Sequence, residues 1–182
     1  QLIDRTRQRA NTFFEKDMVV HVAFADPFCA QTSDMVVHAA QELGVNVHSG
    51  GTMVVMEGPA FSSRAESFMY RSWGADLIGM TALPEAKLAR EAEMCYATMA
   101  WVTDYDCWRQ GGEAVTVKMI IGNLLQNVAA SKDLLRKLIP RLNGTRDCPC
   151  ATALKDAIIT SQDRVPEDLK RKLEPITGRY LS

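Results

Sequence analysis

The sequence predicts a three-layer α/β fold, because two patterns alternate along its 182 residues. Short runs rich in β-branched residues, typical of strands, are followed by longer runs in which apolar residues recur every three or four positions, typical of helices. The connections are short, and the run at 95–102 is nearly all apolar, as in a strand buried on both faces. Strands and helices that alternate in this way build a sheet covered by helices.

The predicted elements follow one another along the whole chain. Residues 1–17 are polar without a clear period, so a loop is predicted there. Strands are predicted at residues 18–22, 45–48, 52–56, 76–80 and 95–102. Helices are predicted at residues 32–43, 62–74, 85–93, 113–138, 151–159 and 167–173, with loops at 103–112 and 143–149.

Several element boundaries carry residues suited to them. Thr32 or Ser33 can cap the first helix, and Gly44 can end it. Gly74 can end the second helix in the same way. Pro84 suits the first turn of the third helix, because a backbone N–H is not needed there. These signals place helix ends more firmly than strand ends.

Composition is that of an ordinary globular domain. Hydrophobic residues make up 47% and charged residues 24%, with a net charge of -1, so neither nucleic acid nor a membrane surface is expected as a partner. No apolar run reaches the roughly 20 residues that a membrane span needs. The chain starts at Gln1 with neither an initiator methionine nor a signal-peptide pattern, which suggests a fragment, a processed chain or half of a split subunit.

Five cysteines are present: Cys29, Cys95, Cys107, Cys148 and Cys150. An odd number without a signal sequence indicates a reducing compartment, and we expect the cytoplasm. The first three lie among apolar residues and are interpreted as core residues. Cys148 and Cys150 could form a strained, labile redox pair or remain free thiols in a loop. No second Cys or His pair sits at ligand spacing, so no metal site is expected.

Ligands of open α/β sheets bind beyond the carboxyl ends of the strands, and three predicted strand ends are conspicuous. After the first, Gly58 and Pro59 indicate a tight turn that lets backbone approach a ligand, followed by the aromatic Phe61 and the hydroxyl of Ser62. The alternative is a turn without any binding role. Met80 ends the second strand, and it is as easily core filler as a ligand contact.

The third strand end carries two carboxylates, Asp104 and Asp106. If the chain stays extended there, both face the same side. A carboxylate accepts hydrogen bonds from an amino group, and a protonated one can donate a proton. A solvated acidic loop is the alternative. A catalytic metal is not favoured, because no His or third carboxylate lies nearby in the sequence.

Four blocks together resemble a known family. They are residues 57–67, 73–76, 79–85 and 103–108, which read EGPAFSSRAES, WGAD, GMTALPE and TDYDCW. With residues 1–6, and with His21 and the Asp-Pro-Phe-Cys run that follows it, they are similar to the methylthioadenosine phosphorylases of the trimeric purine nucleoside phosphorylase family. The resemblance extends from residue 1 to about residue 140 and is loose beyond it.

The resemblance implies a fold, an activity and partners. The fold is a three-layer α/β/α arrangement with a mixed sheet, of which residues 1–182 would be the C-terminal part of a single domain whose N-terminal half is absent. The reaction is attack of phosphate on methylthioadenosine, giving adenine and 5-methylthioribose 1-phosphate. No cofactor is implied, because phosphate is a co-substrate. The N-terminal half, which could be a separate chain, would supply the phosphate site, the isolated fragment would be inactive, and the enzyme would be a homotrimer.

The resemblance also implies roles for single residues. Around adenine it places the catalytic pair and three substrate-binding residues: Asp104, Asp106, Phe61, Ser62 and Thr103. Around the sugar it places Met80 against the ribose and Thr81 near the sugar and phosphate. The apolar methylthio pocket would be formed by Val117, Ile120 and a His21 from a neighbouring subunit.

Two positions bear on which purine is read. Relatives that act on 6-oxopurines carry Glu where Ser62 stands and Asn where Asp104 stands, so both residues favour a 6-aminopurine. The alternatives are a 6-oxopurine nucleoside or methylthioinosine phosphorylase, and a non-catalytic nucleoside-binding fragment.

Overall fold

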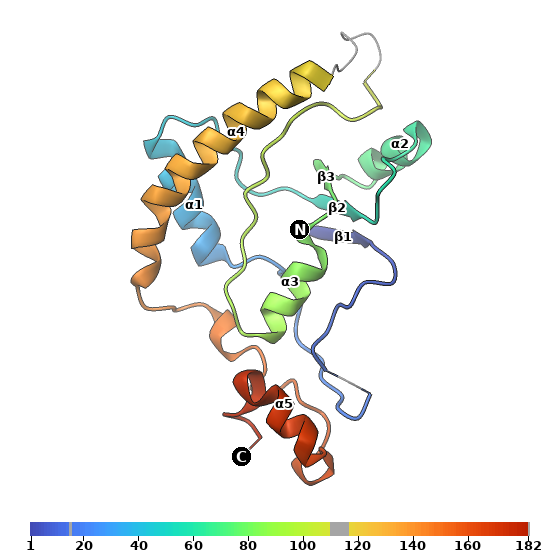
Figure 1. Cartoon of the computed structure of the whole chain (residues 1–182), viewed down its shortest axis with the longest axis vertical. Coiled ribbons are helices and arrows are strands. Elements are labelled where there is room, and N and C mark those ends of the chain that lie inside the picture. Colours follow the sequence, from blue (N-terminus) through green and yellow to red (C-terminus); the bar gives the residue numbers. More distant parts are fainter. Residues whose placement is uncertain (15, 110–116, 182) are drawn as a thin grey trace.

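The centre of the protein is a three-stranded parallel sheet. The computed structural model describes residues 1–14, 16–109 and 117–181. The strands are β1 (Leu2–Arg5), β2 (Met53–Met56) and β3 (Leu77–Gly79), in the spatial order β1-β2-β3 (Figure 1). Val54 and Val55 of the central strand point to opposite faces and are both fully buried. The sheet is therefore covered on both sides, as the apolar strand pattern predicts.

Local sequence signals produce the helices beside the sheet. Helix α2 (Arg64–Ser72) begins with a capping box, in which Ser63 and Glu66 satisfy each other's backbone N–H groups. Helix α3 (Ala82–Glu91) is kinked, because Leu83 is extended and regular helix starts only at Pro84. Helix α3 packs on one face of the sheet through a cluster of buried side chains: Val55, Ala82, Leu83 and Ala86.

A second cluster joins two helices that are distant in the sequence. Helix α1 (Ala30–Glu42) contributes Ala39 and Ala40, and helix α4 (Val117–Leu138) contributes Leu134 and Leu138. Met99 and Trp101 of the segment between α3 and α4 pack against this cluster. None of the helices in the described part of the chain is both long and apolar enough to cross a bilayer.

Four of the sequence predictions for strands and loops are wrong. Residues 2–5, expected in a loop, form β1, because they pair with β2 in register from Leu2 opposite Met53. Residues 18–22, 45–48 and 95–102 form no strand in the structure. The last segment is partly buried without strand pairing, because Tyr96 packs against the cluster of β2 and α3 while Met99 and Trp101 pack against the cluster of α1 and α4.

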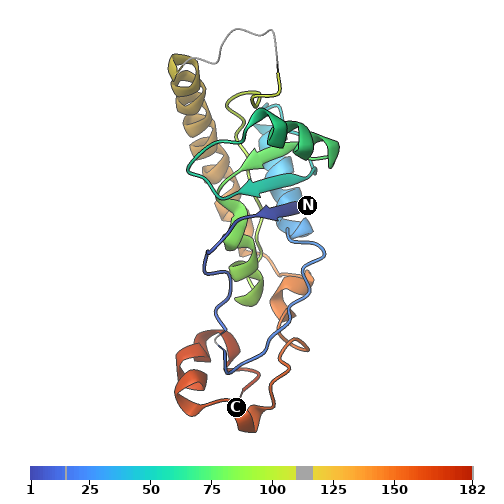
Figure 2. The ribbon, with the colours of Figure 1, turned by 90° about the vertical axis from the view of Figure 1, so that its right-hand side faces the viewer.

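The C-terminal part lies below the sheet in both views (Figures 1 and 2). It contains the 3₁₀ helices η1 (Ile139–Asn143), η2 (Pro149–Thr152) and η3 (Gln162–Arg164), followed by helix α5 (Glu167–Thr177). The prediction of a helix at 151–159 is wrong, because backbone groups of this segment form hydrogen bonds with residues 19–21 instead. The N–H of His21 donates to the carbonyl of Ala157 at 2.9 Å, and the N–H of Ile159 donates to that of Val19 at 2.9 Å.

Candidate active site

One arginine holds the carboxyl ends of β2 and β3 together. Nη1 of Arg9 donates to the carbonyl oxygens of Met80 and Leu83, at 2.6 Å each. Its Nη2 donates to the carbonyl of Glu57 at 2.7 Å, and its Nε donates to the Glu57 carboxylate at 3.0 Å. A guanidinium suits this place because its donors form a rigid fork. No local sequence pattern points to Arg9, which lies in the predicted N-terminal loop.

The Glu57 carboxylate completes this arrangement. The backbone N–H of Arg7 donates to it at 2.6 Å. That hydrogen bond, together with the bond and charge of Arg9, lowers the pKa of Glu57 below its usual value. The turn that follows β2 therefore starts from a charged, anchored side chain.

The turn after β2 packs closely against the end of β3. Gly58 has φ of +72°, and a Cβ built on it would lie 2.8 Å from Sδ of Met80. The backbone conformation thus favours a glycine here, and a larger residue would also have to displace the end of the Met80 side chain. The turn presents Phe61, which is 86% exposed, and a half-buried Ser62. An exposed aromatic ring beside a strand end can receive a planar ligand.

The third element is the aspartate loop, which we define as residues 103–109. Within it Asp106 is half-buried and its two oxygens accept separate hydrogen bonds. Oγ of the buried Ser67 donates to Oδ2 at 2.6 Å, and the N–H of Cys107 donates to Oδ1 at 2.8 Å. Asp104 is exposed and accepts from Oγ1 of Thr103 at 2.7 Å. The two carboxylates therefore differ, one being anchored to α2 and the other accessible.

Contacts on two sides fix the aspartate loop. Nε of Arg64 donates to the carbonyl of Cys107 at 3.3 Å, and Sγ of Cys107 donates to the carbonyl of Ser62 at 3.5 Å. On the other side, Nδ2 of Asn123 in α4 donates to the carbonyl of Thr103 at 2.8 Å. These bonds bring the aspartate loop and the turn after β2 into one region.

The remaining sequence-predicted residues are placed in different ways. Met80 is half-buried against Gly58, and Thr81 is exposed just before α3. The backbone of Val117 and Ile120 lies in the first turns of α4, but their side chains fall outside what the structure describes.

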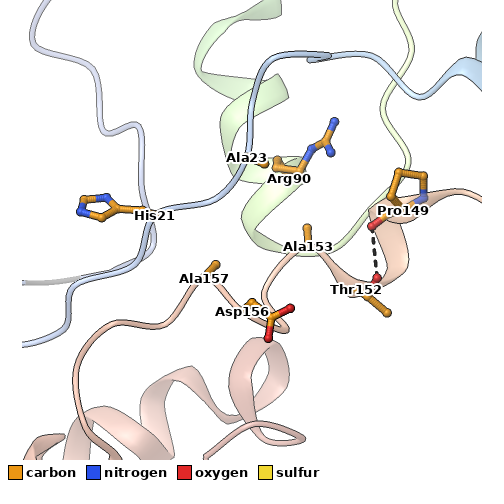
Figure 3. Close-up of a pocket in the computed structure, with 8 residues that line it drawn as sticks. All are labelled: His21, Ala23, Arg90, Pro149, Thr152, Ala153, Asp156 and Ala157. Atoms are coloured by element: carbon orange, nitrogen blue, oxygen red, sulfur yellow. Dashed lines mark hydrogen bonds between the residues drawn. The ribbon is translucent and has the colours of Figure 1, made fainter.

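His21 is not brought to this region within the chain. It is exposed and lines a shallow pocket of about 260 Å³ between residues 21–23, α3 and the C-terminal part. In Figure 3 its ring points away from Arg90, Pro149 and Asp156, which line the same pocket. A second pocket, of about 450 Å³, also borders His21 rather than the strand ends.

Cys148 and Cys150, which could form a redox pair or remain free, are both free thiols in the structure. Sγ of Cys148 lies 3.3 Å from Sγ of Cys95, and Cys150 is buried. Burial is the main cause that raises the pKa of Cys150 to about 12, and the neighbouring thiols add to it. Burial also acts on Cys29, but hydrogen bonds from the hydroxyl and backbone N–H of Thr32 outweigh it and lower the pKa of that thiol to about 7.

Comparison with known proteins identifies the family. The model of the phosphorylase superfamily matches residues 1–140, more than half of the chain. The chain belongs to the phosphorylase superfamily. Over 182 residues it is 53% identical to the S-methyl-5′-thioadenosine phosphorylase of Geobacter sulfurreducens, covering 100% of this chain and 64% of that protein.

Solved structures of this superfamily have the same fold. A methylthioadenosine phosphorylase from an Antarctic soil metagenomic library superposes with a TM-score of 0.90 at 39% identity, covering 97% of this chain and 63% of that one. The methylthioadenosine phosphorylase of Schistosoma mansoni in complex with adenine gives a TM-score of 0.78 at 30% identity, covering 87% and 64%. The expected nucleoside phosphorylase-like fold is thus confirmed, and the chain spans slightly less than two thirds of these relatives.

Proposed function

We propose that the protein catalyses the phosphorolysis of 5′-methylthioadenosine, releasing adenine and 5-methylthioribose 1-phosphate in purine and methionine salvage. The observation that carries the proposal is the joining of the aspartate loop to the turn that presents Phe61 and Ser62. Two carboxylates, a hydroxyl and an exposed aromatic ring then lie at one edge of a sheet, where α/β proteins bind ligands. Relatives named for this activity support it.

The two carboxylates suit different edges of adenine. Both oxygens of Asp106 already accept hydrogen bonds within the protein, which holds the group in place as an acceptor for the 6-amino group. Asp104 is exposed and can bring a proton to N7, which becomes basic as the glycosidic bond breaks. Phe61 would pack beside the ring. Ser62 and Thr103 would complete the polar edge.

The other substrate contacts follow from the same proposal. Met80 would pack against the ribose and Thr81 would lie near the sugar and phosphate. The apolar methylthio pocket would be formed by Val117, Ile120 and His21 of a neighbouring subunit in a homotrimer. The position of His21, away from the strand ends of its own chain, agrees with such an exchange between subunits.

We further propose that residues 1–182 are the C-terminal part of a single nucleoside phosphorylase domain. The remaining part of the domain, in the same or a separate chain, would bind phosphate as the nucleophile, and the 182-residue chain alone would be inactive. Phosphate attack requires no cofactor. The five unpaired cysteines fit a reducing compartment such as the cytoplasm.

The test is a comparison of substrates with the whole protein. With phosphate present, kcat/KM for methylthioadenosine should exceed that for inosine by about 10⁴-fold, because a polar site rejects a base that leaves its groups unpaired. Preference for inosine or methylthioinosine would instead indicate a 6-oxopurine enzyme. Calorimetric binding of adenine without turnover of any nucleoside would indicate a non-catalytic binding protein.

Removal of the arginine that holds the strand ends tests the geometry of the site. Arg9→Met should lower kcat/KM for methylthioadenosine by about 10²-fold, because loss of its bonds to Glu57 and Met80 lets both strand ends shift, and small displacements are costly in catalysis. Steady-state kinetics would measure this. Arg5→Met is the matched control, since Arg5 lies over the ring of Trp73 and interacts with the charge of Glu66 rather than with the strand ends, and it should change kcat/KM little. Equal losses in the two variants would contradict the assigned role of Arg9.

A further inference from the structure

Four of the five cysteines meet at one point. The Sγ atoms of Cys29, Cys95, Cys148 and Cys150 all lie within 4.8 Å of one another. Cys29 and Cys150 are only 3% exposed, and the other two are half-buried. The fifth, Cys107, is exposed and belongs to the aspartate loop. The cluster is separate from the candidate active site, so the proposed reaction does not explain why these four cysteines lie together.

The cluster is assembled from three separate segments. Cys29 lies at the N-cap of α1, Cys95 follows α3, and Cys148 and Cys150 belong to the start of η2. A zinc site is usually recognised in a sequence by two pairs of ligands at short spacing, and this sequence has only one such pair, Cys148 and Cys150. Folding supplies the other two thiols singly, so spacing could not reveal the set.

The distances fit four ligands around one ion. With zinc–sulfur bonds of about 2.3 Å, the sulfurs of a tetrahedral site lie roughly 3.8 Å apart. The four sulfurs lie within 4.8 Å of one another, and Sγ of Cys95 lies 3.3 Å from Sγ of Cys148. No pair among the four is bonded covalently. Four mutually close sulfurs are what a tetrathiolate site requires, whereas two disulfides would need only two separate pairs.

The surroundings of Cys29 favour a thiolate ligand. Cys29 lies at the N-terminal end of a 13-residue helix, where the backbone N–H groups favour negative charge. Oγ1 of Thr32 also donates to Sγ of Cys29 at 3.5 Å. Four thiolates this close together would repel one another unless a cation lay between them. A divalent ion removes this obstacle.

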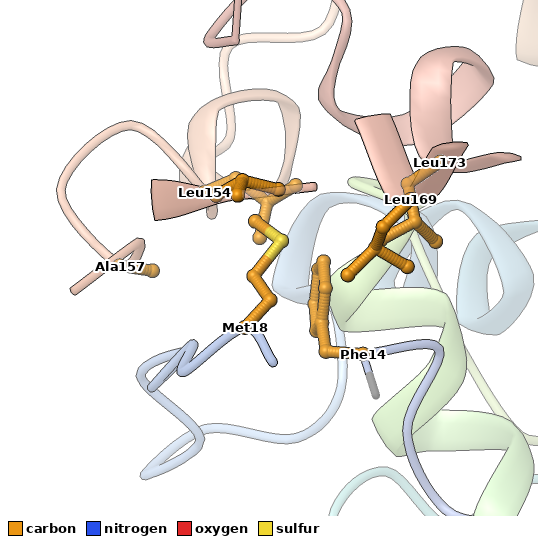
Figure 4. Close-up of a cluster of buried hydrophobic side chains, with 7 residues drawn as sticks. Phe14, Met18, Leu154, Ala157, Leu169 and Leu173 are labelled. Atoms are coloured by element: carbon orange, nitrogen blue, oxygen red, sulfur yellow. The ribbon is translucent and has the colours of Figure 1, made fainter. Parts of the chain in front are cut away.

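We propose that Cys29, Cys95, Cys148 and Cys150 bind one zinc ion as a structural site. Soft thiolate ligands in a tetrahedral set select zinc, and four protein ligands leave no open position for catalysis. The ion would join the start of α1 and the end of α3 to the segment that leads into the C-terminal core. That core consists of Val165 and the residues labelled in Figure 4: Phe14, Met18, Leu154, Ala157, Leu169 and Leu173.

Metal content of the whole protein tests the proposal. Protein purified under reducing conditions from zinc-supplemented cells should contain about one zinc ion per chain by plasma mass spectrometry. Cys95→Ser and Cys148→Ser should each lower this to below about one tenth of an ion, because a lost ligand opens the tetrahedral set. Cys107→Ser, which alters the cysteine outside the cluster, should retain the ion.

A measurement on the unaltered protein guards against variants that fail to fold. Protein stripped of zinc and titrated with Co²⁺ should develop the intense thiolate-to-cobalt charge-transfer and tetrahedral ligand-field bands of a tetrathiolate site, and zinc should abolish them. Absence of bound zinc together with absence of these bands in fully reduced protein would overturn the proposal. Disulfides among the four cysteines in protein isolated with its thiols trapped would overturn it in favour of a covalent or redox role.

Discussion

Asp104→Asn should lower kcat/KM for methylthioadenosine by about 10²- to 10⁴-fold, the range in which loss of a general acid falls. Asparagine keeps the size of the side chain and can still accept the hydrogen bond from Thr103, but its amide cannot transfer a proton to N7 of the leaving adenine. Steady-state kinetics at saturating phosphate would measure the loss. The value of kcat/KM should fall more for methylthioadenosine than for inosine, because the family resemblance implies that relatives acting on 6-oxopurines carry asparagine where Asp104 stands.

Two further variants make this result specific. Asp163→Asn changes an exposed carboxylate of η3, far from the aspartate loop in the sequence, and should leave kcat/KM near that of the unaltered protein. Ser67→Ala removes the donor that holds Asp106 and should lower kcat/KM less than Asp104→Asn does, because the N–H of Cys107 still binds that carboxylate. Near-normal turnover by Asp104→Asn would remove this residue from the mechanism.

Glu93→Ala should destabilise the protein by about 3 kcal/mol, because two donors lose a buried acceptor. Glu93 follows α3 and is 6% exposed. Its Oε1 accepts from the N–H of Leu154 at 2.9 Å and from Oη of Tyr180 at 2.7 Å, and its carboxylate pairs with Arg179. The side chain thus binds the end of α3 to the C-terminal core. Urea unfolding followed by circular dichroism would measure the change.

The location of the effect separates this role from general destabilisation. Hydrogen exchange at the Leu154 amide should accelerate in Glu93→Ala more than exchange in α1 does, because the C-terminal core would open first. Glu93→Gln should cost less, since the amide oxygen can still accept from Leu154. Glu174→Ala, which removes an exposed carboxylate of α5, should change stability little. Equal stability of Glu93→Ala and Glu174→Ala would contradict the assigned role.

Elements with local signals were predicted well. The capping box of Ser63 and Glu66 and the glycine at position 74 place α2 within two residues of its predicted ends, and Pro84 marks where regular helix begins in α3. Such signals act between residues about one helical turn apart, so they can be recognised in the sequence without knowledge of the fold. The start of α4 was predicted at residue 113, which lies outside the described residues.

Strands were predicted less well, because a strand exists only where a partner lies beside it. Leu2–Arg5 reads as a polar loop and is a strand because β2 lies alongside. Residues 95–102 read as a buried strand, but they are only partly buried, and Tyr96, Met99 and Trp101 pack against two side-chain clusters rather than between two strands. Apolar character reports burial, and pairing depends on distant residues.

The sequence by itself determined the phosphorylase family and the approximate positions of most helices, and it indicated Phe61, Asp104 and Asp106 as candidate site residues. Those features depend on residue type and on contacts within a few positions. Only the tertiary structure decided that Arg9 holds two strand ends, that Ser67 anchors Asp106, and that four thiols converge. Each of these joins residues far apart in the chain, and no local pattern encodes which distant groups chain folding will bring within bonding distance.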